Sequence, residues 1–554
     1  MTARGALRVR WLGRVVYRDA LALQHGLHRA GVGAGNWLLL LEHPHVYTMG
    51  VRARPEHVLV DPASVGAELV TADRGGDVTY HGPGQLVGYP ILDVAGGSGS
   101  VPAYVHGVEQ LVIDALTDLG LPGCGRVEGF PGVWVDPGSV APRKIAAVGI
   151  RVSRGRSMHG FALNVDPDLT MFGHIVPCGI ADRGVTSLAA EGIAAPMASV
   201  VDAVVERAEQ RWGGLPAERQ DVAWRVAAGD LAPFTRGEPA GAAAPGPRLV
   251  ARLGAAGVDL GASIPIAGSK PEWMRVKAAM GPEFRALRSK LRSLDLVTVC
   301  EEAGCPNIFE CWADGTATFM IAGERCTRAC GFCLVDTRHP LALDPGEPSR
   351  VADAIAQMGL AHAVVTMVAR DDLADGAIGH MAATVDAIHG RVPGCAVETL
   401  ISDGKGDSHA LVALFAARPE VVAHNVETVP RLQRAVRPSA SYARSLAVLA
   451  RARAAGLTTK TSIILGMGER EDEVLGVLAD LAGIGVDIVT LGQYLRPTAR
   501  HLPVARWWTP AEFDALAAAG MSMGFAHVQA SPLTRSSYHA RQAASAAASD
   551  VASA

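Results

Sequence analysis

Six of the nine cysteines lie between Cys300 and Cys333, and they form two groups of three. The later group, Cys326, Cys330 and Cys333, has the spacing C-x3-C-x2-C in the run CTRACGFC. Three soft thiolates suit an iron–sulfur cluster or zinc, and they would leave one iron of a four-iron cluster open to another ligand. A zinc knuckle usually has a fourth protein ligand and C-x2-C pairs, so this spacing favours the cluster.

The earlier group, Cys300, Cys305 and Cys311, has the spacing C-x4-C-x5-C in the run CEEAGCPNIFEC. A second triad so close to the first would be unusual for structural thiols. A disulfide framework would instead spread its cysteines through a small secreted domain. A tight cluster of cysteines in a large chain therefore indicates metal binding. Cys124 and Cys395 match no motif, and we expect them to be structural thiols.

Together the triads resemble those of radical S-adenosylmethionine enzymes and, among these, of the lipoyl synthases. The resemblance covers residues 270–540 and includes the runs HNVETVPRLQRAVRP and LGQYLRPTARHLPVARWWTP. It implies one [4Fe–4S] cluster that cleaves S-adenosylmethionine and an auxiliary [4Fe–4S] cluster that supplies sulfur to the sixth and eighth carbons of a protein-bound octanoyl chain. The implied ligands are Cys326, Cys330 and Cys333 for the first cluster, and Cys300, Cys305, Cys311 and Ser537 of an RSSY motif for the second.

The N-terminal half carries subtler signals. The run RGGDVTYHGPGQLVGYP (74–90) has closely spaced glycines around His81, and glycines allow a ligand to approach the backbone closely. No Lys-Ser/Thr follows with the spacing of a P-loop. Lys144 and Cys178 come later, in RKIAAVGIRV and VPCGIADRGVTSL. A lone cysteine is more often a buried apolar residue than a nucleophile, so the residues alone leave both readings open.

In this order, these segments resemble the lipoyl(octanoyl) transferases over residues 1–230. The resemblance implies that Cys178 accepts an octanoyl group from acyl carrier protein as a thioester. Lys144 would lower the pKa of that thiol, because an ammonium group stabilises the reactive thiolate. The implied acyl pocket consists of Arg74, Gly75, Gly76, Asp77, Val78, Thr79, Tyr80, His81, Ala147, Val148, Gly149, Gly160, Phe161 and Ala162.

Length and composition limit the other possibilities. A chain of 554 residues with 49% hydrophobic and 19% charged residues predicts two or three globular domains. A formal net charge of −4 does not indicate a nucleic-acid-binding protein. The apolar run Trp37–Leu41 is far shorter than the ~20 residues of a membrane span, and the N-terminus has no signal-peptide pattern. We therefore expect a cytoplasmic protein with neither nucleic acid nor membrane as a partner.

Periodicity predicts different folds for the two halves. In the N-terminal half, strands occur in runs and helices are expected at Tyr104–Gly120 and 196–212, which favours an α+β domain. In the C-terminal half, strands and helices alternate, which favours a parallel sheet closed into a full or partial barrel. Strands are expected at 317–324, 362–368, 395–402, 421–428, 459–467, 487–495 and 526–533, and helices at 350–360, 377–390, 440–455 and 471–484.

The resemblances refine this domain plan. Residues 1–235 should form an α+β domain of the biotin/lipoate ligase-transferase type, and residues 269–540 an α/β partial (β/α)6 radical S-adenosylmethionine barrel. The Gly-, Pro- and Ala-rich stretch within 236–268 should be a linker. The small, polar residues of 541–554 should form a disordered tail.

The two resemblances describe consecutive reactions, so we expect a bifunctional enzyme that makes protein-bound lipoyl from octanoyl-acyl carrier protein. The partners implied are lipoyl domains of 2-oxo acid dehydrogenase E2 subunits, the glycine cleavage H protein, and a ferredoxin or flavodoxin reductant. Three alternatives stay open: a non-catalytic docking module at the N-terminus, an ATP-dependent lipoate ligase at the N-terminus, and a non-enzymatic iron–sulfur carrier at the C-terminus.

Overall fold

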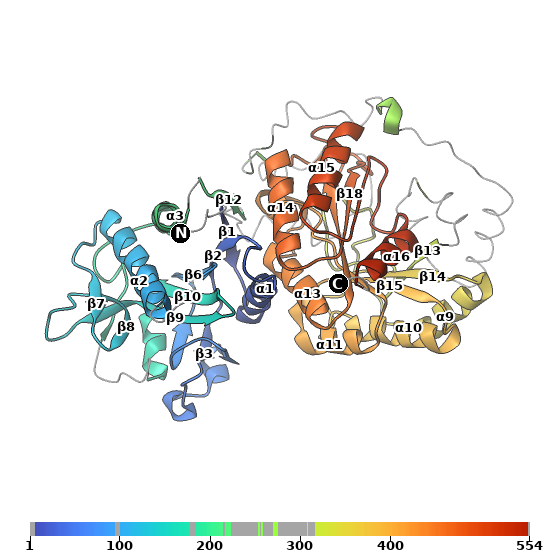
Figure 1. Ribbon diagram of the computed structural model, residues 1–554. Coiled ribbons are helices and arrows are strands. Elements are labelled where there is room, and N and C mark those ends of the chain that lie inside the picture. Colours follow the sequence, from blue (N-terminus) through green and yellow to red (C-terminus); the bar gives the residue numbers. More distant parts are fainter. Residues whose placement is uncertain are drawn as a thin grey trace. The chain divides into compact units, whose positions relative to one another are not determined.

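The protein divides into two compact units, residues 1–224 and 225–554 (Figure 1). The computed structural model describes residues 6–94, 100–176, 184–213, 216–222, 253–254, 256, 258, 270–274, 307 and 316–551. The expected linker, 236–268, lies almost entirely outside these residues. Within the described part of the chain, no helix is both long enough and apolar enough to span a membrane.

In the described part of the first unit, nine strands form one mixed sheet in the order β12-β1-β2-β6-β10-β9-β8-β7, with β11 paired to β9. The run NWLLLLE of β2 is the third strand in this order, and its leucines are fully buried. The strands are β1 (Leu7–Arg14), β2 (Asn36–Glu42), β6 (Gln85–Ile91), β7 (Gly125–Val127), β8 (Phe130–Val135), β9 (Arg143–Ser153), β10 (Arg156–Asn164), β11 (Gly184–Val185) and β12 (Glu218–Asp221).

A small second sheet, β4-β3-β5, carries the start of the glycine-rich run, with β4 at Glu68–Thr71, β3 at Val46–Met49 and β5 at Val78–His81. Helices α2 (Ser100–Asp118) and α3 (Met197–Trp212) pack against each other and against the main sheet. Both match the predicted helices closely, because their apolar residues recur at helical spacing. Helix α1 (Tyr17–Arg29) contacts β6 and β10.

The second unit contains a parallel sheet of seven described strands in sequential order, β13 to β19. Among the described residues β13 and β19 are the two edges of this sheet, so the predicted alternating fold with a partial barrel is confirmed. The strands are β13 (Thr316–Ile321), β14 (His362–Met367), β15 (Ala396–Leu400), β16 (Val421–Ala423), β17 (Thr458–Leu465), β18 (Ile488–Gln493) and β19 (His527–Ala530).

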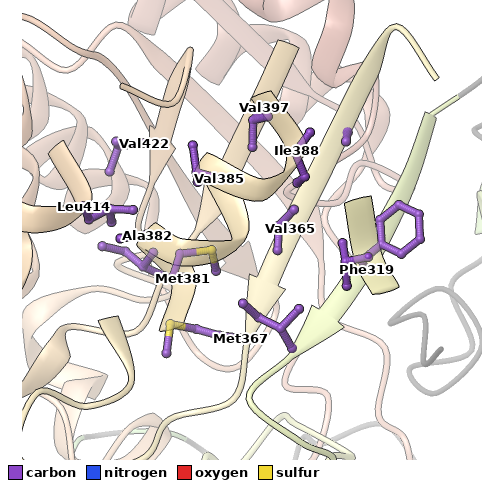
Figure 2. Packing of buried hydrophobic residues seen from close by; sticks show 14 of the residues in the cluster. Phe319, Val365, Met367, Met381, Ala382, Val385, Ile388, Val397, Leu414 and Val422 are labelled. Atoms are coloured by element: carbon purple, nitrogen blue, oxygen red, sulfur yellow. The ribbon is translucent and has the colours of Figure 1, made fainter. Parts of the chain in front are cut away.

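Helices cover the strands of this sheet and bury their apolar faces. Met381, Val385 and Ile388 of α10 belong to one buried cluster with Val365 of β14 and Val397 of β15 (Figure 2). The helices are α9 (Glu347–Met358), α10 (Ile378–Arg391), α11 (Ser408–Ala416), α12 (Gln433–Val436), α13 (Tyr442–Ala454), α14 (Glu471–Gly483), α15 (Pro510–Ser522) and α16 (Ala540–Val551).

The expectation of a disordered tail over 541–554 is wrong for the described residues, because α16 extends to Val551. Ala543 and Ala547 of this helix are buried against Ile488, the first residue of β18. Alanines four residues apart form a narrow apolar stripe on one helix face. The composition of this segment hides the stripe, because alanine also abounds in unstructured tails.

Candidate active sites of the two units

The later cysteine triad lies in the loop that follows β13, at the carboxyl end of the parallel strands, where barrels of this kind carry their chemistry. Backbone hydrogen bonds fix the loop. The amide of Cys326 donates to the carbonyl of Asp336 at 2.8 Å, and the amide of Gly331 donates to the carbonyl of Val436 at 2.9 Å. His501 also bonds the carbonyl oxygen of Cys333 through Nε2, at 2.9 Å.

A buried ion-pair cluster pins the same loop to the ends of two neighbouring strands. Arg328, between the first two cysteines, donates from Nε to Asp371 Oδ2 at 2.7 Å and from Nη2 to Asp403 Oδ1 at 2.6 Å. Burial alone would raise the pKa of Asp403, but the Arg328 guanidinium outweighs burial and lowers that pKa to about 2. Asp371 follows β14 and Asp403 follows β15, so the charges tie the cysteine loop to both strand ends.

The three cysteines are half-buried in one loop. Burial raises the pKa of Cys330 to about 11 and that of Cys333 to about 12, and neighbouring thiols of the loop add to both rises. Within the residues that the structure describes, no three His, Cys, Asp or Glu side chains are arranged to hold a single metal ion.

The earlier triad, Cys300, Cys305 and Cys311, lies outside the described residues. Asn307, which falls between its second and third cysteines, is described and buried. Its Nδ2 donates to the carbonyl of Leu533 at 2.7 Å. The Oγ of Ser537, four residues after Leu533, lies 3.1 Å from Oγ1 of Thr318 on β13. These two contacts bring the middle of the triad segment, the RSSY motif and β13 together.

In the first unit, a cavity with an empty volume of about 450 Å³ lies where β9, β10 and the glycine-rich run meet. The predicted pocket residues that line it are Arg74, Gly75, Gly76, Thr79, His81, Ala147, Val148, Gly149, Gly160, Phe161 and Ala162.

Three predicted pocket residues, Asp77, Val78 and Tyr80, do not line this cavity. Val78 and Tyr80 alternate with Thr79 along β5, so they face away from it and pack in a separate apolar cluster. Asp77 instead accepts a hydrogen bond from Nδ1 of His57 at 2.6 Å. The family resemblance covers a contiguous run of residues, so it could not tell which side chains of the strand face the cavity and which face away.

Four residues line the cavity that were absent from the predicted pocket: Tyr17, Val87, Tyr89 and His159. His159 directly precedes the predicted Gly160, so its place in the same strand was a usable signal. Tyr17 is the first residue of α1 and is distant in sequence from all the predicted segments, and no local pattern could have identified it.

Glycines shape the cavity by allowing backbones to approach each other. A Cβ atom on Gly149 would lie 3.0 Å from the carbonyl oxygen of Gly75, and one on Gly160 would lie 2.1 Å from that of Gly88. A side chain at either position would push the strand or the loop away from its neighbour. The glycine pattern read from the sequence therefore has a steric cause in the pocket wall.

A chain of buried hydrogen bonds leads from the cavity towards Lys144. His81 Nδ1 bonds Gln85 Oε1 at 2.8 Å, and Gln85 Nε2 donates to Asn164 Oδ1 at 2.9 Å. Asn164 Nδ2 donates to the carbonyl of Thr186, and the amide of Thr186 donates to the carbonyl of Lys144, both at 2.9 Å. This series of hydrogen bonds thus fixes the backbone at Lys144, the lysine predicted from the sequence.

Lys144 is the second residue of β9 and is 8% exposed, with its Nζ 4.7 Å from the ring centroid of Trp134. An ammonium group over an indole face is held by the ring quadrupole. Cys178 lies outside the described residues, between Val176 and Gly184. Gly184 begins β11, whose Val185 pairs with Lys144. Cys124, by contrast, packs against the core of this unit, and burial raises its pKa to about 11.

Comparisons with known proteins divide the chain in the same way. A family model described as the lipoyl protein ligase A/B catalytic domain matches residues 16–209. The radical S-adenosylmethionine superfamily matches 320–481, and the N-terminal domain of lipoyl synthase matches 267–305. The lipoyl synthase of Mycobacterium avium (strain 104) is 56% identical over 279 residues, which are 50% of this chain and 91% of that protein.

This chain belongs to the lipoyl synthase family. A second lipoyl synthase, from Rubrobacter xylanophilus, is 53% identical over 275 residues, covering 49% of this chain and 86% of its own. The predicted fusion is confirmed: a ligase/transferase-type catalytic domain precedes the lipoyl synthase domain. A solved bi-partite lipoate protein ligase from Thermoplasma acidophilum is 18% identical, with a TM-score of 0.34, and covers 40% of this chain and 88% of that one.

Membership of a radical lipoyl synthase family implies a [4Fe–4S] cluster and S-adenosylmethionine. The residues around the later triad fit such a cluster. Cys326, Cys330 and Cys333 supply three half-buried soft donors from one loop that is anchored on both sides. Iron binding would displace the thiol protons, which burial otherwise holds in place.

Proposed function

We propose that this chain makes protein-bound lipoyl from octanoyl-acyl carrier protein in two consecutive reactions. The first unit would transfer the octanoyl group to a lysine of a lipoyl domain, and the lipoyl synthase unit would then insert two sulfur atoms. The observation that carries the first half is the cavity beside β9 and β10, whose lining includes most of the residues expected in an acyl pocket.

In the first reaction, the Cys178 thiolate would attack the carbonyl carbon of the octanoyl thioester. A new thioester to Cys178 forms, and the carrier's thiol leaves with a proton. The lysine amine of a lipoyl domain would then attack, forming the amide and releasing the Cys178 thiol. The ammonium group of Lys144 would stabilise the thiolate. Exchange between thioesters changes the free energy little, and formation of the amide from the thioester lowers it. The reaction therefore requires no ATP.

In the second reaction, the residues of this chain would bind the two clusters and hold the cysteine loop in position. Cys326, Cys330 and Cys333 would hold one [4Fe–4S] cluster, and Arg328 keeps their loop in place through its bonds to Asp371 and Asp403. When bound, two clusters and S-adenosylmethionine supply the electron, the radical and the sulfur. The implied ligands of the auxiliary cluster are Cys300, Cys305, Cys311 and Ser537.

We propose the partners that these reactions require. Octanoyl-acyl carrier protein would be the donor, and the acceptors would be lipoyl domains of 2-oxo acid dehydrogenase E2 subunits and the glycine cleavage H protein. A ferredoxin or flavodoxin would supply electrons. The contact of Ser537 with Thr318 and that of Asn307 with Leu533 support the auxiliary site, because they bring its distant segments together.

One anaerobic experiment tests the whole proposal. The full chain is given octanoyl-acyl carrier protein and an apo-lipoyl domain, with or without S-adenosylmethionine and reductant, and the domain is weighed. We expect an octanoyl mass gain without reductant and a lipoyl mass gain with it. Cys178→Ser should abolish both, whereas the matched Cys124→Ser should leave both unchanged. Undiminished transfer by Cys178→Ser would contradict the role of Cys178 as nucleophile. No octanoyl gain with the unmodified protein would favour a docking module, and a requirement for ATP would favour a ligase.

The two-cluster part has its own measurement. Anaerobically reconstituted protein should contain about eight irons per chain, four for each cubane. Cys305→Ala should lower this to about four. About four irons in the unmodified protein, or zinc in place of iron, would contradict the sulfur-donor role.

A further inference from the structure

Three buried apolar residues lie in the stretch of sequence that was expected to be a linker. Leu253 is 1% exposed, Ala256 6% and Val258 8%. The amides of Ala256 and Val258 both donate to the carbonyl oxygen of Leu253, at 3.1 and 2.9 Å, so the three residues form a compact turn. Burial removes their apolar surface from water, which indicates a packed contact rather than a solvated linker. We call these three residues the entry turn.

The entry turn packs on the loop that follows β17. A Cβ atom on Gly468 of this loop would lie 2.7 Å from Cγ2 of Val258, so the glycine leaves room for the valine side chain. Arg431, in the segment after β16, joins the two sides. Its Nη1 donates to the carbonyl of Ala256, and its Nη2 donates to the carbonyl of Gly468 at 2.7 Å. Nη2 also donates to the buried carboxylate of Glu473, at 2.8 Å.

Glu469 braces the same loop from within. Its buried carboxylate accepts hydrogen bonds from the amides of Gly466 and Met467 through Oε2, at 2.8 and 2.9 Å. Its Oε1 accepts from the hydroxyl of Thr428 at 3.1 Å. Thr428 lies after β16, three residues before Arg431. The segments that follow β16 and β17 are therefore joined by hydrogen bonds from both residues.

A third segment connects this loop to the cysteine loop. The amide of Ala505 donates to the carbonyl of Gly466 at 2.8 Å, and the amide of Leu502 donates to the carbonyl of Gly331 at 2.9 Å. Gly331 directly follows Cys330. A Cβ atom on Gly331 would lie 2.7 Å from Cγ of Leu502, so the two segments approach each other closely. The entry turn thus reaches the cysteine loop through the loop after β17 and the segment 502–505.

The parallel sheet brings these segments to one end of the second unit. The strands β13 to β19 pair in parallel, so the loops that follow β13, β16 and β17 lie at the same edge of the sheet. The entry turn therefore meets this unit at the end that carries the cysteine loop.

We propose that the entry turn is a positioning element of the lipoyl synthase unit. It holds the loop after β17 and, through Ala505 and Leu502, keeps the cysteine loop in the shape that retains the cluster. The stretch before residue 259 is then part of the working unit and not only a connection to the first one. This inference does not depend on octanoyl transfer by the first unit, and only its iron measurement depends on the implied cluster.

Val258→Lys tests the proposal. It places a long side chain and a second cation beside the guanidinium of Arg431, so it should release the turn. The first readout is amide hydrogen exchange in the full chain before iron is added, measured by mass on peptides that cover 466–468, 502–505 and 326–333. We expect exchange in all three to be about tenfold faster than in the unmodified protein, because local opening sets the rate. Peptides of α10 should exchange at an unchanged rate.

The second readout is iron retention by the reconstituted protein. Val258→Lys should lose iron to a chelator about tenfold faster than the unmodified protein, because the cysteine loop opens more often. Arg431→Met should behave in the same way in both readouts, since it removes the bond to the carbonyl of Ala256. The matched control is Val412→Lys. Val412 is exposed on α11, and the same substitution there should change neither rate.

Three outcomes would overturn the proposal. The first is exchange within about twofold of the unmodified protein in both Val258→Lys and Arg431→Met. The second is faster exchange in 466–468 alone, because the effect would then not reach the cysteine loop. The third is faster exchange throughout the second unit, α10 included, because the turn would then support the whole fold. If the unmodified protein binds no iron, the implied cluster fails, while the exchange rates still decide on the entry turn.

Discussion

Burial governs which single residues of this protein can ionise. His43 is fully buried, with Nδ1 2.7 Å from the carbonyl oxygen of Val15 and Nε2 2.8 Å from the hydroxyl of Tyr89. Burial lowers its pKa to about 4. His424 in the second unit is in the same situation, and burial together with Arg437 lowers its pKa to about 4. Each unit thus contains a buried histidine whose protonation would disfavour the folded state of that unit.

Both units should therefore lose stability as the pH falls from about 6.5 towards 4. In this range the unfolded chain binds a proton that folded His43 does not, so protonation favours unfolding. The stability present above pH 6.5 should drop by about 3 kcal/mol per histidine at pH 4. Thermal unfolding measured between pH 7.5 and 4.5 checks this. His43→Gln should reduce the pH dependence of the first unit, to which buried His81 and His159 also contribute, whereas the exposed His106→Gln should leave it unchanged. Equal slopes in both variants would contradict the prediction.

Lys144 provides a second prediction about a single residue. In the proposed mechanism, Lys144→Met should slow thioester formation on Cys178 by about a hundredfold at pH 7, because the thiol would lose a positive charge that favours its ionised form. Raising the pH towards 9 should restore much of the rate, since an unassisted thiol ionises near pH 8.5. Rates of acyl-enzyme formation against pH measure this. The exposed Lys405→Met is the control, and a Lys144→Met defect that high pH does not relieve would point to a structural role.

Among the secondary-structure elements, helix α16 covers one end of the parallel sheet of the second unit. It contacts β14, β17, β18 and β19, and Ala540, Ala543 and Ala547 are buried. Ile488 and His527 begin β18 and β19, so α16 covers the amino ends of these strands, opposite the cysteine loop. Small side chains allow the helix to lie close to the sheet.

Ala543→Asp should therefore destabilise the second unit by about 2–4 kcal/mol, because it buries a charge without a partner. Ser545→Asp, on the exposed part of the same helix, should change stability by less than about 0.5 kcal/mol. Denaturant unfolding of both variants measures the difference. Equal stability of the two variants would show that the helix is not packed as described.

For the molecule as a whole, the two units are separate compact bodies, and this has a functional consequence. In the proposed pathway, the octanoylated lipoyl domain that the first unit releases would be at a raised local concentration near the second unit, because the two units are covalently joined. We expect lipoyl production at low enzyme concentration to fall when the chain is divided within 236–252, while each part keeps its own reaction. Mass measurement of the lipoyl domain over time compares the joined and divided proteins. Equal flux would remove the advantage of the fusion.

The sequence alone determined the features that depend on short spacing. The alternation of strands and helices in the second unit was readable, because periods of 2 and 3.6 residues are local properties. The triad Cys326, Cys330 and Cys333 was readable too, because its three cysteines lie within one short run of sequence. The group of glycines around His81 was readable for the same reason, because these glycines lie within one short run.

Only the tertiary structure decided what distant segments build together. Tyr17 and His159 line one cavity although one begins a helix and the other lies in a strand far along the chain. Asn307 meets Leu533 across 226 residues of sequence. The sequence likewise did not show which face of β5 lines the cavity, or that α16 packs against the sheet. Such contacts arise from how whole elements pack, and no period or spacing within a short segment records that packing.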